Sequence, residues 1–252
     1  MEPSIPYVGF SAFGHPSECD AVRAAIRPER LLMFGALMYG DPREWNPYRS
    51  PKRCPKYDVL STIFQLRTNV LHLLHFGARP DCDLSEDLCL AHERAGQHCD
   101  GIQVNEPAFP DPRALRHYKE RFKSTIALAC QPDAIRLVDR DPKKLVEKLK
   151  EYTDLIEYVL IDESAGAGHA LNPSFLDECY REISAAMPHV TPICCGGLHA
   201  GNVAERVGPL ARKFRVGTDA EGALRTLDDT NSVRSCIRYG QRTDALLAEC
   251  GY

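Results

Sequence analysis

The residues best suited to chemistry follow a short apolar run, YVLI, at positions 158–161. Asp162 and Glu163 come directly after this run, and a loop of small residues then leads to Asn172-Pro173. The β-branched apolar run predicts a buried strand, and Asn172-Pro173 predicts the start of a helix. Because glycines in the loop let backbone N–H groups approach a ligand, and a helix N-terminus attracts anions, the stretch predicts a carboxylate beside an anion site. An ordinary strand-to-helix turn is the alternative.

A second glycine turn strengthens the anion-site interpretation. Gly196-Gly197 ends the next predicted strand, just as Gly166 and Gly168 follow the strand before it. Phosphate sites in α/β barrels are often built from the backbone N–H groups of neighbouring late loops. Neither loop contains a lysine. The two turns together therefore predict a phosphate site whose donors are backbone N–H groups.

Alternating strands and helices must position these residues. Apolar runs predict eight strands, at residues 6–12, 31–38, 69–76, 101–105, 124–129, 158–161, 191–195 and 214–217. Helices are predicted to begin near residues 16, 57, 84, 112, 142, 173, 201 and 231. Eight such units in 252 residues predict an α/β fold, a single-domain (β/α)8 TIM barrel over residues 1–252. An open doubly wound sheet is the rival, but no G-x-G-x-x-G motif follows the first strand.

In such barrels the active site lies at the carboxyl ends of the strands. Strand parity places Tyr158, Leu160 and Asp162 on one face and Glu163 on the other, so that Asp162 points inward if the first face lines the lumen. The polar residues at the predicted strand ends are His15, Arg43, His75, Gln103, Asn105, Glu106, Gln131, Asp162, Glu163, Thr218, Asp219 and Glu221.

Gln103 and Asn105 share one face of the fourth predicted strand. Buried amides require hydrogen-bond partners. Either a bound ligand or a polar network in the core would supply them.

Composition limits the classes of partner. The net charge is −4, the sequence pI is about 6.1, and the chain has no basic block, which argues against nucleic acid. No apolar run approaches the roughly 20 residues of a membrane span. The N-terminal residues lack the pattern of a signal peptide. We therefore expect a cytoplasmic protein.

Eleven cysteines are present, and in a cytosolic chain they are expected to be reduced. Cys194-Cys195 fall within a predicted strand, where cysteine often acts as a small buried hydrophobe. A zinc site is the alternative for the cluster Cys82, Cys89, His92, His98 and Cys99, but no CxxC pair occurs and the spacing matches no common structural site. We expect no metal.

Several of these motifs together resemble one family. Asp162-Glu163-Ser164 with Gly166-x-Gly168, followed by Gly196-Gly197-Leu198 and Asn202-Val203, resembles the last third of phosphoribosylanthranilate isomerase. The weaker matches are Gly101-Ile102-Gln103-Val104, which resembles the strand-four V-Q-L-H of that family, and Asp41-Pro42-Arg43, which resembles its S-P-R after strand two.

The resemblance implies a cofactor-free Amadori rearrangement of a phosphorylated aminoaldose to an aminoketose. It also implies that Asp162 is the general acid. The chain departs from the family at two positions. In the family a strand-one cysteine acts as the general base, but residues 8–15 here read VGFSAFGH and contain no cysteine. Asn105 replaces a strand-four histidine of the family. Ser11 is a poor base unaided.

His15, His75 and Glu106 are the candidates to replace the missing base. Of the three, His75 needs the least tuning, since histidine titrates near neutrality. A core histidine bonded to a backbone carbonyl is the alternative for His75.

We therefore expect a sugar-phosphate isomerase that acts on a small phosphorylated substrate, with no cofactor, nucleic acid or membrane partner; a homo-oligomer is left open. Catalysis is assigned to Asp162, His75 and Glu106, and substrate or phosphate binding to Gly166, Gly168, Gly196, Gly197, Arg43, Gln103 and Asp219. A phosphosugar aldolase or epimerase is an alternative, although the tips of strands five to eight offer no lysine for a Schiff base. A non-catalytic ligand-binding barrel is the third interpretation, favoured by the missing base.

Overall fold

Eight parallel strands close on themselves in the computed structural model, which describes residues 3–46, 52–79, 82–162 and 172–252. Each strand pairs with its neighbours in chain order, and the last strand pairs with the first. The strands are β1 (Val8–Phe10), β2 (Leu32–Tyr39), β3 (Val70–Gly77), β4 (Gly101–Val104), β5 (Thr125–Cys130), β6 (Tyr158–Ile161), β7 (Thr191–Cys194) and β8 (Gly217–Ala220).

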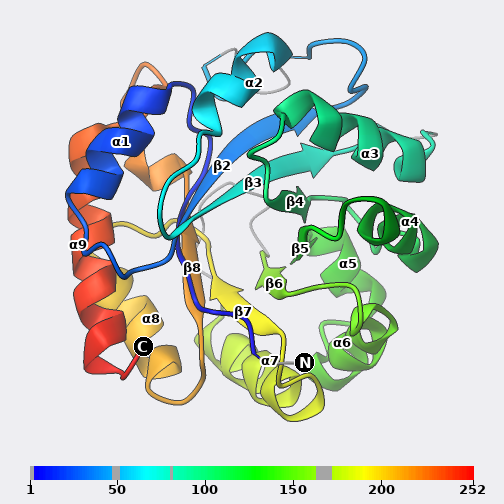
Figure 1. Cartoon of the computed structure of the whole chain (residues 1–252). Helices are drawn as coiled ribbons and strands as arrows, with labels where there is room; N and C mark the ends of the chain where they lie inside the picture. Colours follow the sequence, from blue (N-terminus) through cyan, green and yellow to red (C-terminus); the bar gives the residue numbers. More distant parts are fainter. Residues whose placement is uncertain (1–2, 47–51, 80–81, 163–171) are drawn as a thin grey trace.

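Helices surround the strands on the outside of the barrel (Figure 1). They are α1 (Pro16–Ala24), α2 (Tyr57–Ile63), α3 (Leu84–Ala95), α4 (Pro112–Phe122), α5 (Pro132–Leu137), α6 (Pro142–Leu149), α7 (Pro173–Ala186), α8 (Val203–Ala211) and α9 (Val233–Glu249), with short 3₁₀ turns η1 (Lys150–Tyr152) and η2 (Gly222–Leu224). This architecture confirms the predicted (β/α)8 barrel. None of the helices in the described ranges is long and apolar enough to span a bilayer.

An Asp-Pro or Asn-Pro pair fixes where several of these helices begin. The Asp111, Asp141 and Asn172 side chains each accept a hydrogen bond from a backbone N–H in the first turn of the following helix. Proline occupies the first helical position in each case, where its missing N–H costs nothing. The helix starts predicted near residues 112, 142 and 173 are confirmed.

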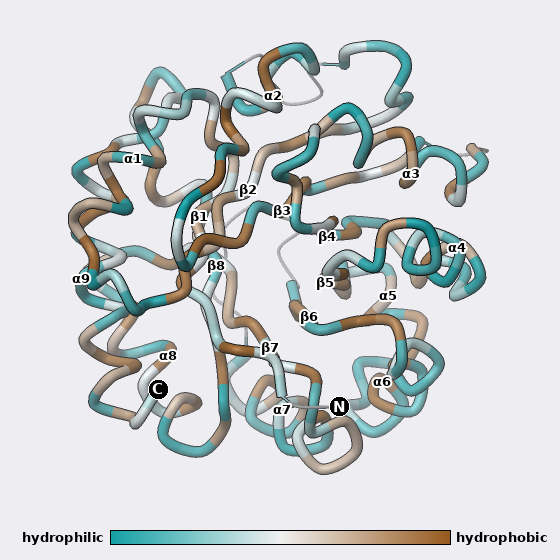
Figure 2. The backbone as a smooth tube through the Cα atoms, viewed as in Figure 1, coloured by the Kyte–Doolittle hydropathy of each residue, from teal (hydrophilic) through white to brown (hydrophobic). Residues whose placement is uncertain are grey.

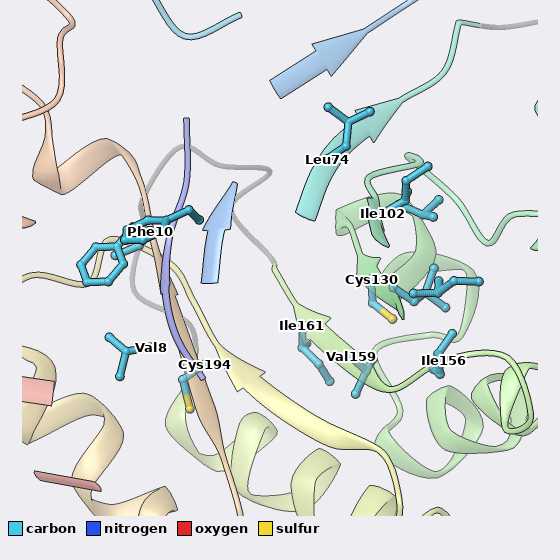
Figure 3. Packing of buried hydrophobic residues seen from close by; sticks show 14 of the residues in the cluster. Val8, Phe10, Leu74, Ile102, Cys130, Ile156, Val159, Ile161 and Cys194 are labelled. Atoms are coloured by element: carbon cyan, nitrogen blue, oxygen red, sulfur yellow. The ribbon is translucent and has the colours of Figure 1, made fainter. Parts of the chain in front are cut away.

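The barrel has two apolar layers. Outward-facing strand residues pack against the helices, and Figure 3 shows part of this layer around Phe10, Ile102 and Val159. A smaller cluster fills the lumen below the mouth, with Tyr7, Met33, Leu73, Ala127, Ala129, Tyr158, Leu160 and Ile193. The apolar residues follow the strands, whereas the hydrophilic ones lie mainly on the outer helices and loops (Figure 2). Burial of both strand faces explains why the strands read as continuous apolar runs.

Three parts of the sequence-based prediction were wrong in detail. Strand eight was expected at 214–217, but β8 is Gly217–Ala220, a sequence poor in intrinsic strand formers. Its pairing with β1 overrides that local preference. The helix α5 was not predicted, because its six residues are too few to display a helical period. β1, expected at 6–12, covers only Val8–Phe10.

A buried ion pair joins the end of the chain to its beginning. Asp244 on α9 is 5% exposed and accepts a hydrogen bond from Nε of Arg30, which is 7% exposed, at 2.6 Å. Arg27 also binds this carboxylate. Burial opposes ionisation of Asp244, but hydrogen bonds from Arg27 and Arg30 outweigh it and lower the pKa of the carboxyl. These contacts link α9 to the segment between α1 and β2.

We predict that Asp244→Asn destabilises the protein by about 3–5 kcal/mol, because it leaves the guanidinium of Arg30 buried without a carboxylate. Urea unfolding at pH 7 measures the change. Glu147→Gln is the control, since it removes one partner of an exposed ion pair with Lys150 and should cost under about 1 kcal/mol. Equal midpoints for the two variants would contradict the role given to Asp244.

Candidate active site

A cleft opens at the carboxyl ends of the strands. The empty space in the cleft is about 640 Å³, a volume that includes open solvent at the mouth. The described lining residues lie at or just beyond the ends of all eight strands. They are Ser11, Leu37, Tyr39, His75, Gln103, Asn105, Ala129, Gln131, Leu160, Asp162, Cys195, Gly196, Gly197, Asp219, Glu221 and Gly222. This is the location expected for a barrel active site.

Asp162 lines the cleft directly after β6. Tyr158 and Leu160 belong to the cluster in the lumen, whereas Val159 and Ile161 pack outward against the helices. The inward direction that strand parity predicts for Asp162 is therefore confirmed. Its backbone N–H donates to the carbonyl of Cys130 at 3.0 Å, which extends the β5–β6 ladder to the mouth and fixes the backbone of Asp162 there.

Ser11 and Asp219 form a buried pair at the junction of β1 and β8. The Ser11 hydroxyl donates to Oδ1 of Asp219 at 2.6 Å, and the two residues are 3% and 7% exposed. Burial raises the pKa of the Asp219 carboxyl to about 7, and the hydrogen bond from Ser11 limits the rise. The negative charges of Glu221 and Asp162 raise this pKa further. Asp219 therefore exchanges its proton near neutral pH.

His75 and Gln103 lie side by side on β3 and β4, where the two residues are register partners. Burial lowers the pKa of His75 to about 3, so its ring is neutral at physiological pH. His75 Nε2 lies against Gly35 of β2, where a Cβ atom would come within 2.5 Å of it. Nε2 of His75 and Oε1 of Gln103 are buried without a hydrogen-bond partner, while Nε2 of Gln103 donates to Oδ1 of Asn105 at 3.0 Å. Two buried polar atoms of residues in the cleft wall thus have no hydrogen-bond partner in the described structure.

The turn after β7 adopts a conformation that favours glycine. Gly196 and Gly197 have φ angles of 86° and 62°. Their carbonyl oxygens accept hydrogen bonds from Arg206 at 3.1 Å and from Asn202 at 2.9 Å. These side chains hold the turn at the rim of the cleft, just before α8.

Cys195 lies beyond the end of β7 and lines the cleft. The prediction that it falls within a strand was therefore wrong. Burial raises the pKa of its thiol well above the ordinary value, and the charges of Asp162 and Asp219 add to the effect. The thiol is therefore protonated and a poor nucleophile. Cys194 is fully part of β7 and buried, as predicted.

Three predicted site residues lie outside the described lining. Arg43 binds Asp87 at 2.7 Å and Asp41 at 3.1 Å through Nη1. Glu106 accepts a hydrogen bond from the N–H of Ala78 at 2.8 Å, and burial raises its pKa.

His15, the remaining candidate base, caps α1 through Nδ1 and likewise does not line the cleft. Glu163, Gly166 and Gly168 lie outside the described residues.

Charge at the cleft is negative in the part of the chain that the structure describes. Among the described residues, the lining includes Asp162, Asp219 and Glu221 and has no lysine or arginine. Glu221 is paired at the rim with Arg53, at 2.9 Å. No group of three His, Cys, Asp or Glu residues in the described ranges is arranged to hold a metal ion.

Fold and cleft together define a (β/α)8 barrel with polar groups at its mouth. No protein-family model and no curated protein sequence matches the chain. Among solved structures, the chain is similar to N-(5′-phosphoribosyl)anthranilate isomerase from Pyrococcus furiosus, with a TM-score of 0.65 and 16% identity over 95% of this chain and 99% of that one.

Two further enzymes have similar structures. The tryptophan synthase alpha chain of Legionella pneumophila has a TM-score of 0.63 and 12% identity over 98% of this chain and 93% of that one. Orotidine 5′-monophosphate decarboxylase from Methanocaldococcus jannaschii has a TM-score of 0.57 and 11% identity over 95% and 98%. At these identities the likenesses show a shared TIM-barrel fold.

We predict that His75 stays neutral between pH 8 and pH 5, which ¹⁵N NMR of its ring would detect. Because its folded pKa of about 3 lies below the value of about 6.5 expected when unfolded, protons bind more tightly to the unfolded chain. The stability that His75 contributes is therefore complete above about pH 6.5 and is lost as the pH falls.

Urea unfolding of the wild type and His75→Gln at pH 7 and pH 5 measures this difference. Between pH 7 and pH 5 the free energy of unfolding of the wild type should fall by about 2 kcal/mol more than that of the variant, because one pKa unit corresponds to about 1.36 kcal/mol. The same loss in both proteins would show that His75 already titrates normally.

Proposed function

We propose that this protein catalyses an acid–base isomerisation of a small phosphorylated sugar derivative, with Asp162 as the general acid. The observation that carries the proposal is the position of Asp162, which lies on the inner face at the end of β6, in the same cleft as a second carboxylate that titrates near neutrality. An aldose-to-ketose conversion needs one group to donate a proton and another to accept one. Two carboxylates in different environments can divide these roles.

The glycine turn supports the phosphorylated class of substrate. Gly196 and Gly197 bring backbone close to the rim, and an anion held by N–H groups needs no lysine. The P. furiosus neighbour is named for a phosphoribosyl substrate, and its fold is shared over nearly all of this chain. We therefore propose phosphoribosyl-like compounds, N-(5′-phosphoribosyl)anthranilate among them, as the first substrates to assay.

We predict that Asp162→Asn lowers turnover by roughly 10²–10⁴-fold, the usual contribution of a positioned proton donor. Phosphate affinity should change little. Turnover is measured on a panel of phosphorylated aldoses and aminoaldoses. Asp154→Asn is the matched control, since Asp154 is exposed and lies before the other end of β6. Full activity with a lowered melting temperature would make Asp162 a structural residue. Tight binding of the panel without turnover by the wild type would favour a binding barrel.

We also predict that Gly197→Asp weakens the binding of inorganic phosphate by about fivefold or more, because like charges about 4 Å apart cost about 1 kcal/mol even in bulk water. Gly197→Asn is the matched control, since asparagine has the same size and the same tolerance for a positive φ without the charge. Isothermal titration calorimetry gives both affinities. Equal affinity in the two variants would place the phosphate elsewhere.

A further inference from the structure

The proposed isomerisation leaves one proton without an acceptor, and the candidates predicted from the sequence do not supply it. His75 is buried and has a pKa of about 3, which makes it a weak base. Glu106 accepts a hydrogen bond from the N–H of Ala78, and His15 caps α1, so both lie outside the described lining of the cleft. Residues 8–15 contain no cysteine, and the hydroxyl of Ser11 in that segment does not ionise at neutral pH.

Ser11, however, does not act alone in the structure. Gly9 of β1 is the register partner of Asp219 on β8, and this pairing brings the Ser11 hydroxyl within 2.6 Å of Oδ1 of Asp219. Both residues line the cleft that also contains Asp162. A carboxylate has two oxygens, so Oδ1 can accept the Ser11 hydrogen bond while Oδ2 accepts a proton from a substrate.

We propose that Asp219 is the general base of this site and that Ser11 is the positioning residue that holds its carboxylate. The inference rests on the proposed function. In the open-chain form of the sugar, C1 is doubly bonded to oxygen or nitrogen. Asp219 takes the proton from C2, and the C–H electron pair forms a C1=C2 double bond. The π electrons of the C1 heteroatom bond move to that heteroatom, which gains a proton. Return of a proton to C1 and loss of the one on the C2 oxygen completes the conversion without an oxidant or reductant.

The electrostatic surroundings suit a base that works near pH 7. Burial is the main cause of the raised pKa of Asp219, and it also makes the ionised carboxylate a stronger proton acceptor. A base is most effective when its pKa lies near the operating pH. The titratable and charged groups that face Asp219 from the surrounding elements are Tyr7 before β1, Asp162 after β6, Cys195 after β7, Glu221 after β8, which Arg53 neutralises in part, and Tyr239 on α9.

The sequence assigned Asp219 to substrate or phosphate binding, and the structure favours a different role. A carboxylate that is half ionised near pH 7 is a poor partner for a phosphate dianion, because like charges repel. A purely structural role, in which the Ser11 hydrogen bond only fastens β1 to β8, is the remaining alternative. The two roles differ in how activity should depend on pH.

The test measures kcat/KM against pH for the wild type and four variants on the substrate identified from the phosphosugar panel. The wild type should gain activity as the pH rises through about 7, where Asp219 loses its proton. Asp219→Asn, which can still accept the Ser11 hydrogen bond, should lower kcat/KM by roughly 10²–10⁴-fold. Ser11→Ala should move the rising limb to higher pH, since it removes a hydrogen bond that lowers the pKa.

Glu221→Gln should move the same limb to lower pH, since it removes a negative charge that raises the pKa of Asp219. Asp154→Asn, far from the cleft, should leave the limb in place. Opposite shifts from Ser11→Ala and Glu221→Gln test the base even if Asp219→Asn fails to fold, because both keep Asp219. A merely structural hydrogen bond would change stability and leave the limb where it was.

The outcomes separate the two proposals. If the wild type turns over a phosphosugar but Asp219→Asn retains its activity, or the limb stays fixed in both neighbouring variants, the base assignment is overturned and the proposed function stands. If the wild type turns over no member of the panel, the proposed function fails and the base assignment fails with it.

Discussion

The pairing of β8 with β1 is the constraint on which the site depends. It sets the register of Asp219 against Gly9 and brings Ser11 beside a residue 208 positions later in the chain. The Ser11 N–H donates to the carbonyl of Ala220, and the Thr218 N–H donates to the carbonyl of Tyr7. In a closed barrel each strand is held on both sides, so no strand can shift its register without breaking two ladders. The cleft is therefore rigid on the side where the carboxylates lie.

Burial at the barrel mouth shifts the pKa values of three residues that line the cleft. The same loss of solvation raises the pKa of Asp219 and Cys195 and lowers the pKa of His75, which moves all three toward neutral forms. Cys195 and His75 are thereby removed from proton transfer near pH 7. The pKa of Asp219 rises only to about 7, and the hydrogen bond from Ser11 is the largest contribution that limits the rise.

The barrel itself could be predicted from the sequence, and the bounds of β6 and the start of α7 matched because an apolar run and an Asn-Pro pair mark them strongly. β8 could not be located, because Gly-Thr-Asp-Ala becomes a strand only through pairing with β1. The inward direction of Asp162 followed from parity within one strand. Parity ends with the strand, however, and so it did not predict that Arg43 and Glu106 bind neighbouring loops and helices. The Ser11–Asp219 pair joins residues that are far apart in the sequence, and no local sequence pattern predicts such a contact.

Gly35 has a consequence for how this protein can change over evolutionary time. The His75 ring occupies the space that a side chain at position 35 would need, since a Cβ there would lie 2.5 Å from Nε2. A larger residue at position 35 therefore requires a smaller one at position 75, whereas a smaller residue at position 75 is compatible with Gly35. Relatives of this chain should therefore show paired substitutions at the two positions, with glycine retained wherever the histidine is. That covariation could be sought in sequences alone.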